Sequence, residues 1–190
     1  LIGVAEIHYW HGFDRLLKGL ANYYIHAPQY KVYFHIIGDF FSPREREEYM
    51  SIIKENHLAP YVILHGRQAG QMLDLLFELC DFGSGSLGRH RSGITNIKTL
   101  KNREYAARGI PFIYSEIDED FENMPYIMKI PANEEAVDIK QILNFYNQLH
   151  ITPLEIRNSI RHLSWNNQMK KVLDEMQKKD KINPNNNNIG

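Results

Sequence analysis

A short polar stretch in the middle of the chain carries the residue types that hold a phosphate and a sugar hydroxyl. Thr99 has the type and position of a helix N-cap, and Lys98 and Lys101 lie on either side of it. The unpaired N–H groups of a helix start, here around Thr99 and Leu100, and the positive end of the helix dipole favour a bound phosphate. Glu104, further along this helix, can accept hydrogen bonds from two neighbouring hydroxyls such as those of a ribose. The alternative is a solvent-exposed helix face on which the lysines and Glu104 bind no ligand.

A helix and a buried strand must position these side chains. Residues 100–107 are good helix formers, and Gly109 and Pro111 predict that the helix ends there. Residues 110–113 then form a short apolar run, which is typical of a strand covered on both faces. The phosphate-binding groups would thus lie at the start of a helix that leads directly into a sheet.

The rest of the chain alternates between apolar runs and segments whose apolar residues have helical spacing. We expect strands at residues 1–7, 31–37, 61–64 and 126–130, and helices at residues 12–24, 42–56, 69–79, 133–149 and 152–176. Thr152 opens a capping box, Asn133 is expected to cap its helix, and a helix break is expected near Ser164. The alternation predicts an α/β fold, with a Rossmann-like, mostly parallel sheet and helices on both faces.

Loops at the carboxyl ends of parallel strands are where open α/β sheets bind ligands. Gly38 and Arg67 follow the second and third strands, which makes them candidate contacts for a base or a phosphate. The alternative for Arg67 is a surface cation. Residues 83–88 match the dinucleotide fingerprint as GSGSLG, but they belong to the fourth unit and no helix follows directly, so we reject that interpretation. The acidic residues 116–122 are interpreted as a solvent-exposed loop.

The string TLKNREYAARGIPF resembles the second half of the donor-site motif of GT-B-fold glycosyltransferases, of the retaining group-1/family-4 type. In that family a Glu stands eight residues before a second Glu, which opens a Glu-x-x-x-x-Gly-x-Pro string. Glu104, Gly109 and Pro111 match this string. The resemblance therefore implies that Glu104 binds the ribose. Asn96 stands at the position of the first Glu, where it can hydrogen-bond a sugar hydroxyl but supplies no charge.

The first loop, EIHYWHGFDRL, resembles an Arg-then-Lys-Gly pattern of the same family, whose two cations neutralise the donor diphosphate. Gly12 and the helix after it match, but Glu6 stands where the Arg is expected and His11 where the Lys is expected. A protonated His11 beside a phosphate and an ordinary loop histidine both stay open. The resemblance also implies three residues on the donor-sugar loop, namely Ser86, His90 and Arg91.

The resemblance covers most residues from Leu1 to Met176 and implies a carboxyl-terminal, nucleotide-sugar-binding domain. We assign residues 1–180 to this domain and expect the Asn-rich residues 181–190 to be a flexible tail. Because the sequence opens on a strand without Met, we expect an amino-terminal, acceptor-binding domain of the same protein to be missing. Apolar residues of the last helix are expected in the core, the alternative being a face against that domain; they are Trp165, Met169, Val172 and Met176.

The implied activity is transfer of a sugar from a nucleoside-diphosphate sugar to a hydroxyl acceptor. This domain would hold the nucleotide sugar and stabilise the leaving diphosphate, and any catalytic base would belong to the missing domain. The family usually needs no metal, and the histidines show neither metal-ligand spacing nor a cysteine companion, so we expect no cofactor and no metal. Two alternatives stay open: a catalytically degenerate GT-B-like binding or interaction domain, and a sugar-nucleotide epimerase.

Composition and charge limit the remaining classes. At 190 residues with 43% hydrophobic content, the chain is long enough for one good core. A formal net charge of −1 argues against nucleic acid as a partner. The single Cys80 excludes an internal disulfide and fits a reducing compartment. No apolar run approaches the roughly 20 residues needed to cross a bilayer. We expect a cytoplasmic protein, with peripheral membrane contact left open for the missing part.

Overall fold

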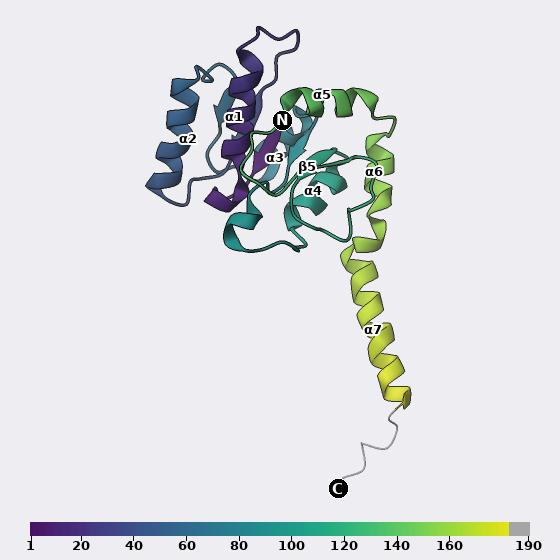
Figure 1. Cartoon of the computed structure of the whole chain (residues 1–190). Helices are drawn as coiled ribbons and strands as arrows, with labels where there is room; N and C mark the ends of the chain where they lie inside the picture. Colours follow the sequence, from purple (N-terminus) through teal and green to yellow (C-terminus); the bar gives the residue numbers. More distant parts are fainter. Residues whose placement is uncertain (183–190) are drawn as a thin grey trace.

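The computed structural model describes the backbone of residues 1–182 and the side chains of residues 1–177. Its centre is a six-stranded sheet in the order β3-β2-β1-β4-β5-β6, in which all neighbouring strands are parallel (Figure 1). The strands are β1 (Ile2–Val4), β2 (Phe34–Ile37), β3 (Val62–Leu64), β4 (Gly83–Ser84), β5 (Phe112–Tyr114) and β6 (Ile127–Lys129). The predicted Rossmann-like sheet is confirmed. Of the predicted tail, residues 183–190 lie outside the described residues.

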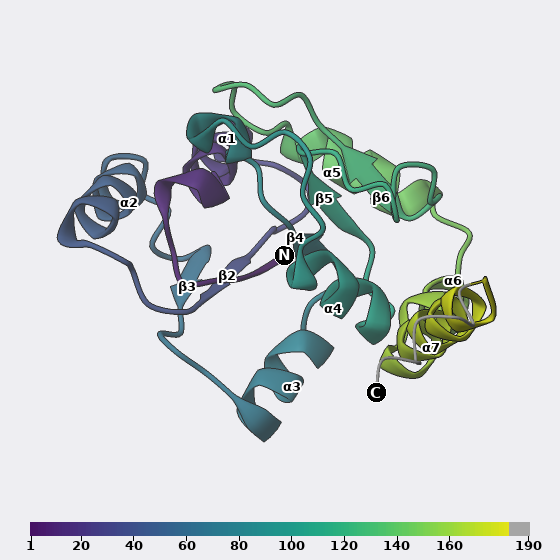
Figure 2. The same ribbon diagram turned by 90° about the horizontal axis from the view of Figure 1, so that it is seen from below.

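Helices cover both faces of this sheet, as predicted. The α-helices are α1 (Phe13–Tyr24), α2 (Pro43–Glu55), α3 (Gly70–Glu78), α4 (Leu100–Arg108), α5 (Ile139–Gln148), α6 (Pro153–Ser159) and α7 (Trp165–Ile182), and the short 3-10 helices are η1 (Tyr9–His11), η2 (Arg89–Ser92) and η3 (Arg161–Leu163). Helices α1, α2 and α5 bury one core, which includes Leu16 and Tyr49. Helices α3, α4 and α6 bury a second core on the other face, which includes Leu76 and Tyr105 (Figure 2).

The α4–β5 unit forms as its sequence predicts. The Thr99 hydroxyl caps α4 by accepting a hydrogen bond from the backbone N–H of Asn102 at 3.3 Å. Gly109 ends α4 in the left-handed conformation, with φ of 77°, which a glycine adopts at little cost. All three residues of β5 are buried because helices cover both of its faces. Since α4 follows β4, its amino end lies at the carboxyl edge of the sheet.

The start of α5 differs from the prediction. Asp138, and not Asn133, caps this helix: its carboxylate accepts hydrogen bonds from two backbone N–H groups at 2.9 and 3.4 Å. The Asn133 side chain instead accepts a hydrogen bond from Arg15 at 2.9 Å, a contact between distant parts of the chain that a local pattern does not reveal. The capping box that begins at Thr152 is confirmed at the start of α6.

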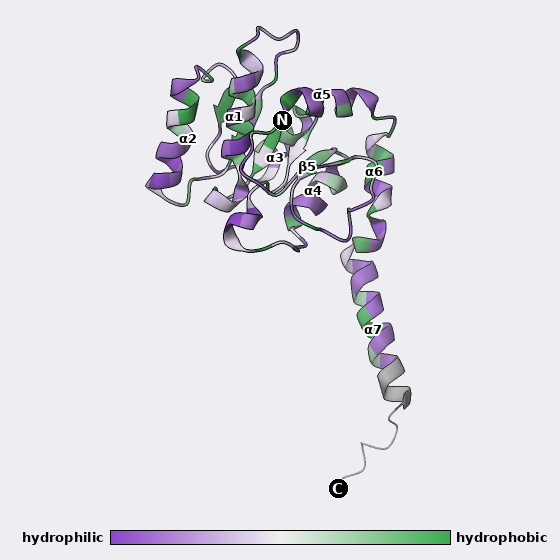
Figure 3. Cartoon of the chain, in the orientation of Figure 1, coloured by the Kyte–Doolittle hydropathy of each residue, from purple (hydrophilic) through white to green (hydrophobic). Residues whose placement is uncertain are grey.

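Helix α7 also differs from the prediction. It leaves the body of the molecule after the break at η3, which confirms the break expected near Ser164 (Figure 1). Its apolar residues are exposed and not in the core, with exposed fractions of 82% for Trp165, 47% for Met169, 48% for Val172 and 58% for Met176 (Figure 3). Their role as a face against another domain stays a prediction. None of the helices within residues 1–182 is both long and apolar enough to span a bilayer.

Candidate functional site

The strand order reverses between β1 and β4, which is the point where open α/β sheets bind ligands, and we call the region between the loops after these two strands the crevice. The two loops touch each other, because the backbone N–H of Leu87 donates to the carbonyl of His11 at 2.9 Å. Gly12 has φ of 67°, and a Cβ at this position would lie 2.6 Å from the backbone nitrogen of Gly88. The match of Gly12 to the family pattern thus has a physical reason, because only glycine fits this approach.

We expect Gly12→Ala to destabilise the chain by about 2 kcal/mol or more, because it combines left-handed strain with a backbone clash. Chemical denaturation measures the loss. Gly93→Ala is the matched control: Gly93 also has positive φ, at 70°, but its Cβ would meet nothing within 4 Å. Equal losses in the two variants would show that the close approach of the loops contributes nothing.

Lys101 is a charged residue whose ammonium group the fold buries at this edge of the sheet. It is the second residue of α4, and its ammonium nitrogen is buried without a hydrogen-bond partner. This nitrogen lies 5.4 Å from the ring centroid of Phe13, the residue after Gly12, so it faces the first loop. Burial lowers the pKa of Lys101 to about 7, opposed by the charge of Glu116. A cation held in this way gains from an incoming anion, because no group among the described residues hydrogen-bonds it.

Three more unpaired polar groups lie at the same edge. Neither carboxylate oxygen of Glu116, just after β5, has a hydrogen-bond partner, and the same holds for the Ser86 hydroxyl and for Nε of Arg89. Glu116 is 2% exposed and Ser86 is 1% exposed. The charges of Lys101 and Arg89 act on the pKa of Glu116, so the charged groups lie close together without bonding to one another. Unpaired buried polar groups are costly, and a cluster of them points to a ligand.

The interpretation of residues 116–122 as a solvent-exposed loop is wrong. Asp118 is fully buried and accepts hydrogen bonds from Asn102 at 3.1 Å and from Arg103 at 2.9 and 3.2 Å. These contacts fold the acidic segment back onto α4. They also hold Glu116 inside the crevice, where the sequence pattern did not place it.

The first loop supplies no cation. His11 is buried and accepts a hydrogen bond from the backbone N–H of His8 through Nδ1, at 3.0 Å. Burial, with the charges of Lys101 and Arg89, lowers the pKa of His11 to about 2, so the ring is neutral. Glu6 is exposed and contacts the His8 ring at 3.2 Å. The role of His11 beside a bound phosphate stays a prediction.

Glu104 lies outside the buried cluster. Its side chain is 40% exposed on α4 and accepts hydrogen bonds from Arg108 at 3.1 and 3.2 Å. Arg108 also pairs with Asp74 of α3 at 2.8 Å. A ligand hydroxyl that binds Glu104 therefore shares the carboxylate with Arg108. The role of Glu104 as the ribose-binding residue stays a prediction.

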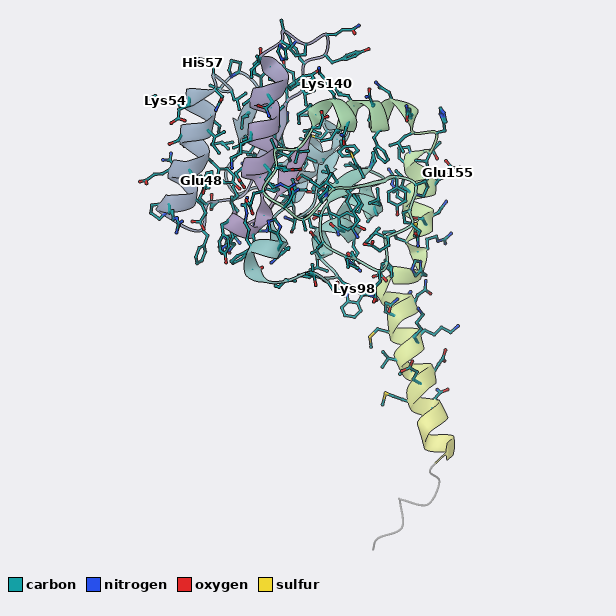
Figure 4. The ribbon with its side chains drawn as sticks, viewed as in Figure 1. Glu48, Lys54, His57, Lys98, Lys140 and Glu155 are labelled. Carbon is teal, nitrogen blue, oxygen red and sulfur yellow. The ribbon has the colours of Figure 1, made fainter. Side chains whose placement is uncertain are left out.

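The other predicted residues of this region are near the surface. The side chain of Leu100 is 85% exposed and has no hydrogen-bonding group. Leu100 could therefore bind a phosphate only through its backbone N–H. Lys98, labelled in Figure 4, pairs with Asp120 at 3.2 Å and with a second acidic side chain at 3.4 Å. Asn96 is exposed, and its backbone pairs with Ile117. Lys98 and Asn96 thus do not join the buried cluster.

Gly38 and Arg67 follow β2 and β3, at the same edge of the sheet. Gly38 has φ of 125°, and a Cβ there would lie 1.7 Å from the carbonyl oxygen of Ala5, so its role in the fold is established. Arg67 is exposed. Their contacts with a base or phosphate stay predictions. Among the described residues, no group of three or more metal-ligating side chains forms a metal site.

No protein family model and no curated protein matches this sequence. Solved structures do match. A glycosyltransferase from Rickettsia africae superposes with a TM-score of 0.71 at 18% identity, covering 93% of this chain and 47% of that chain. Anabaena HepE in complex with UDP matches with a TM-score of 0.68 at 17% identity, covering 92% and 48%. The C-terminal domain of the group 1 glycosyl transferase LpcC from Francisella tularensis matches with a TM-score of 0.57 at 15% identity, covering 84% and 83%.

The chain has the fold of a GT-B carboxyl-terminal domain. At these identities the likeness shows the fold alone. This GT-B domain spans about half the length of the first two matching proteins, whereas the Francisella structure is itself a C-terminal domain. The fold predicted from the motif around Glu104 is thereby confirmed.

In this GT-B domain, Arg91 joins the β4 loop to other elements and does not face the crevice. It binds the Asp14 carboxylate at 2.8 and 3.0 Å and the Glu134 carboxylate at 2.5 to 3.1 Å. His90 also contacts Glu134, at 2.6 Å. Of the three residues predicted on the donor-sugar loop, two have a buried side-chain atom without a hydrogen-bond partner among the described residues: Ser86, through its hydroxyl, and His90, through Nδ1.

Glu116 and Arg89 are the two members of the cluster that the sequence reasoning missed. Both follow a strand at its carboxyl end, Glu116 after β5 and Arg89 after β4. This is the rule that selected Gly38 and Arg67, so the same rule could have found all four. Glu116 was not predicted as a site residue, because the acidic composition of residues 116–122 indicated a solvent-exposed loop.

Proposed function

We propose that this domain binds the nucleoside-diphosphate sugar donor of a glycosyltransferase, with the diphosphate against the amino end of α4. The observation that carries the proposal is the buried, unpaired ammonium of Lys101. Its position in the first turn of α4 adds the helix dipole and the unpaired N–H groups to the same anion. Arg89 supplies a second positive charge from the β4 loop.

The proposed reaction is transfer of the sugar to a hydroxyl acceptor. Negative charge grows on the leaving diphosphate as the sugar departs, and Lys101 and the helix start would stabilise it there. Solved structures of the fold include HepE with UDP and with UDP-glucose, which supports this class of ligand. The acceptor would bind in a second domain, since the chain corresponds to about half of these proteins.

The experiment that tests the proposal is titration calorimetry of the chain with UDP, GDP, UDP-glucose and GDP-mannose at up to millimolar concentration. We expect saturable binding of at least one of them, with a stoichiometry of one. Absence of binding to all four, in a chain whose circular dichroism shows it folded, would contradict the proposal.

One observation favours a second candidate, a binding domain that has lost the donor chemistry. Neither Glu6 nor the neutral His11 supplies the charge that the first loop has in the resembling family. Tight binding of UDP without preference for any UDP-sugar would favour this candidate. Preference for one UDP-sugar favours the transferase.

We further expect Glu104→Ala to weaken UDP binding at least about tenfold, because hydrogen bonds to a charged carboxylate contribute about 1.5–3 kcal/mol. The same change should have little effect on binding of 2′-deoxy-UDP, which lacks one of the two hydroxyls. Calorimetry with both nucleotides measures the difference. Glu48→Ala, an exposed carboxylate on α2 (Figure 4), is the control. Equal losses for UDP and 2′-deoxy-UDP would remove Glu104 from the ribose site.

A further inference from the structure

Glu116 carries a buried carboxyl group that no side chain among the described residues hydrogen-bonds. The residue is 2% exposed, and both carboxylate oxygens lack a hydrogen-bond partner. An acidic group left in this state destabilises the folded chain. Burial raises the pKa of Glu116 to about 7, whereas the backbone N–H groups of Glu116 and Ser115 and the charges of Lys101 and Arg89 act to lower it. Hydrogen-bond donors of a ligand would satisfy this carboxyl group.

The surroundings of Glu116 define what that ligand must offer. Ser86 lies beside it, because the backbone N–H of Ser115 donates to the Ser86 carbonyl at 3.0 Å and thus joins the β4 and β5 loops. The Ser86 hydroxyl is also buried and unpaired. Lys101 and Arg89, by contrast, present only hydrogen-bond donors. The cluster therefore needs anionic oxygens on one side and hydroxyl groups, which donate to a carboxylate, on the other.

The diphosphate part of a nucleoside diphosphate does not meet this need, and its ribose hydroxyls are assigned above to Glu104, which lies outside the buried cluster. Its phosphates offer acceptors only, so they suit Lys101 and Arg89 but are repelled by an ionised Glu116. The sugar attached to the terminal phosphate carries several hydroxyls within one or two bonds of its ring, and each can both donate and accept. Such a sugar places donors toward Glu116 while its phosphate stays beside the two cations.

We propose that Glu116 and Ser86 bind hydroxyl groups of the donor sugar and so select the sugar. The proposal rests on the function proposed above and assigns it a specificity residue. The backbone supports the placement: Ile97 and Thr95 exchange hydrogen bonds with Ile117, at 2.9 and 2.7 Å, so segment 95–97 runs beside Glu116. The buried carboxyl thus lies next to the segment that carries the exposed Asn96, the residue to which the motif assigns the sugar contact.

The test compares each sugar nucleotide with its parent diphosphate. Calorimetry of the wild-type chain with UDP, UDP-glucose, UDP-galactose, UDP-N-acetylglucosamine, GDP and GDP-mannose should show one sugar nucleotide bound at least fivefold tighter than its parent. In Glu116→Gln this advantage should vanish, while the affinity for the parent diphosphate stays within twofold or increases. Glu48→Gln, on the exposed face of α2, should keep the wild-type pattern.

The outcomes separate the two proposals. If no nucleotide binds the wild-type chain, both proposals fail. If Glu116→Gln weakens parent and sugar nucleotide by the same factor, or if the wild-type chain shows no sugar advantage, the role of Glu116 is overturned while nucleotide binding stands. If Glu116→Gln does not fold, Ser86→Ala decides: loss of the sugar advantage supports the proposal, and an unchanged advantage overturns it.

Discussion

Lys101→Met is expected to weaken UDP binding at least about 30-fold while leaving the chain as stable as, or more stable than, the wild type. Removing one partner of a desolvated charge pair costs about 2–5 kcal/mol of binding free energy, and 2 kcal/mol corresponds to about 30-fold. Methionine has a similar length and fills the space beside Phe13. Calorimetry gives the affinity, and urea denaturation gives the free energy of unfolding.

The expected gain in stability follows from the state of Lys101 without ligand. Its ammonium is buried and unpaired, so the pKa of about 7 is well below that of an exposed lysine. The unfolded chain then binds more protons between pH 7 and about 10, so wild-type stability increases with pH over this window. The advantage of Lys101→Met should be greatest at pH 7 and below, and should disappear toward pH 10.

Binding of UDP should take up protons. Without ligand, the side chain of Lys101 is largely a neutral amine above pH 7. A bound phosphate favours the protonated form, so uptake should approach about one proton per UDP at pH 8. Ionisation of Glu116 acts in the same direction, because its negative charge repels the phosphate as the pH rises. Wild-type affinity should therefore fall from pH 7 to pH 9, more steeply than that of Lys101→Met.

A lysine on the opposite edge of the sheet serves as the control. Lys54 lies at the far end of α2 in Figure 4 and is exposed, so Lys54→Met should leave both the affinity and its pH dependence unchanged. Calorimetry in two buffers of different ionisation enthalpy counts the protons. If Lys101→Met binds UDP as the wild type does, the diphosphate does not lie at the amino end of α4.

The contrast between Thr99 and Glu116 shows what the sequence could predict. Thr99, Gly109 and β5 follow local rules of capping, chain reversal and apolar spacing, and the structure confirms them. The environment of Glu116 depends on a contact of another kind: Asp118 folds back onto α4 through Arg103, fifteen residues earlier. No local pattern distinguishes such an acidic segment from a solvent-exposed one, because composition gives only the average behaviour of charged residues.

Lys98 and Lys101, which lie on either side of the N-cap of α4, show the same limit of sequence-based prediction. Both were candidates for the phosphate on the basis of sequence. The fold buries the ammonium of Lys101 beside Phe13, whereas Lys98 pairs with acidic side chains of the 116–122 segment. Which lysine stays without a partner depends on how the segment after β5 packs. The motif match around Glu104 predicted the fold. Only the tertiary contacts show that Lys101, and not Lys98, has an ammonium group without a hydrogen-bond partner among the described residues.

Arg15→Met is expected to lower the free energy of unfolding by about 3–5 kcal/mol, a larger loss of stability than we expect from Gly12→Ala. Arg15 is 2% exposed. Its guanidinium donates to the carbonyl of Leu87, to that of Pro131 at 3.1 Å, to that of Glu135 at 2.8 Å and to Asn133 at 2.9 Å. Methionine removes all four hydrogen bonds; the Pro131 carbonyl and the Asn133 side chain keep a backbone N–H donor, whereas the Leu87 and Glu135 carbonyls lose the Arg15 donor.

The substitution should also change the positions of the loops at the crevice, because Leu87 connects Arg15 to the first loop. The carbonyl of Leu87 accepts from Arg15, and its N–H donates to His11 at 2.9 Å. UDP affinity of Arg15→Met, measured at a temperature where the variant is folded, should therefore fall although Arg15 contacts no ligand. Arg44→Met, an exposed arginine on α2, should change neither stability nor affinity beyond about 0.5 kcal/mol. A drop in stability without loss of affinity would show that the crevice tolerates movement of the β4 loop.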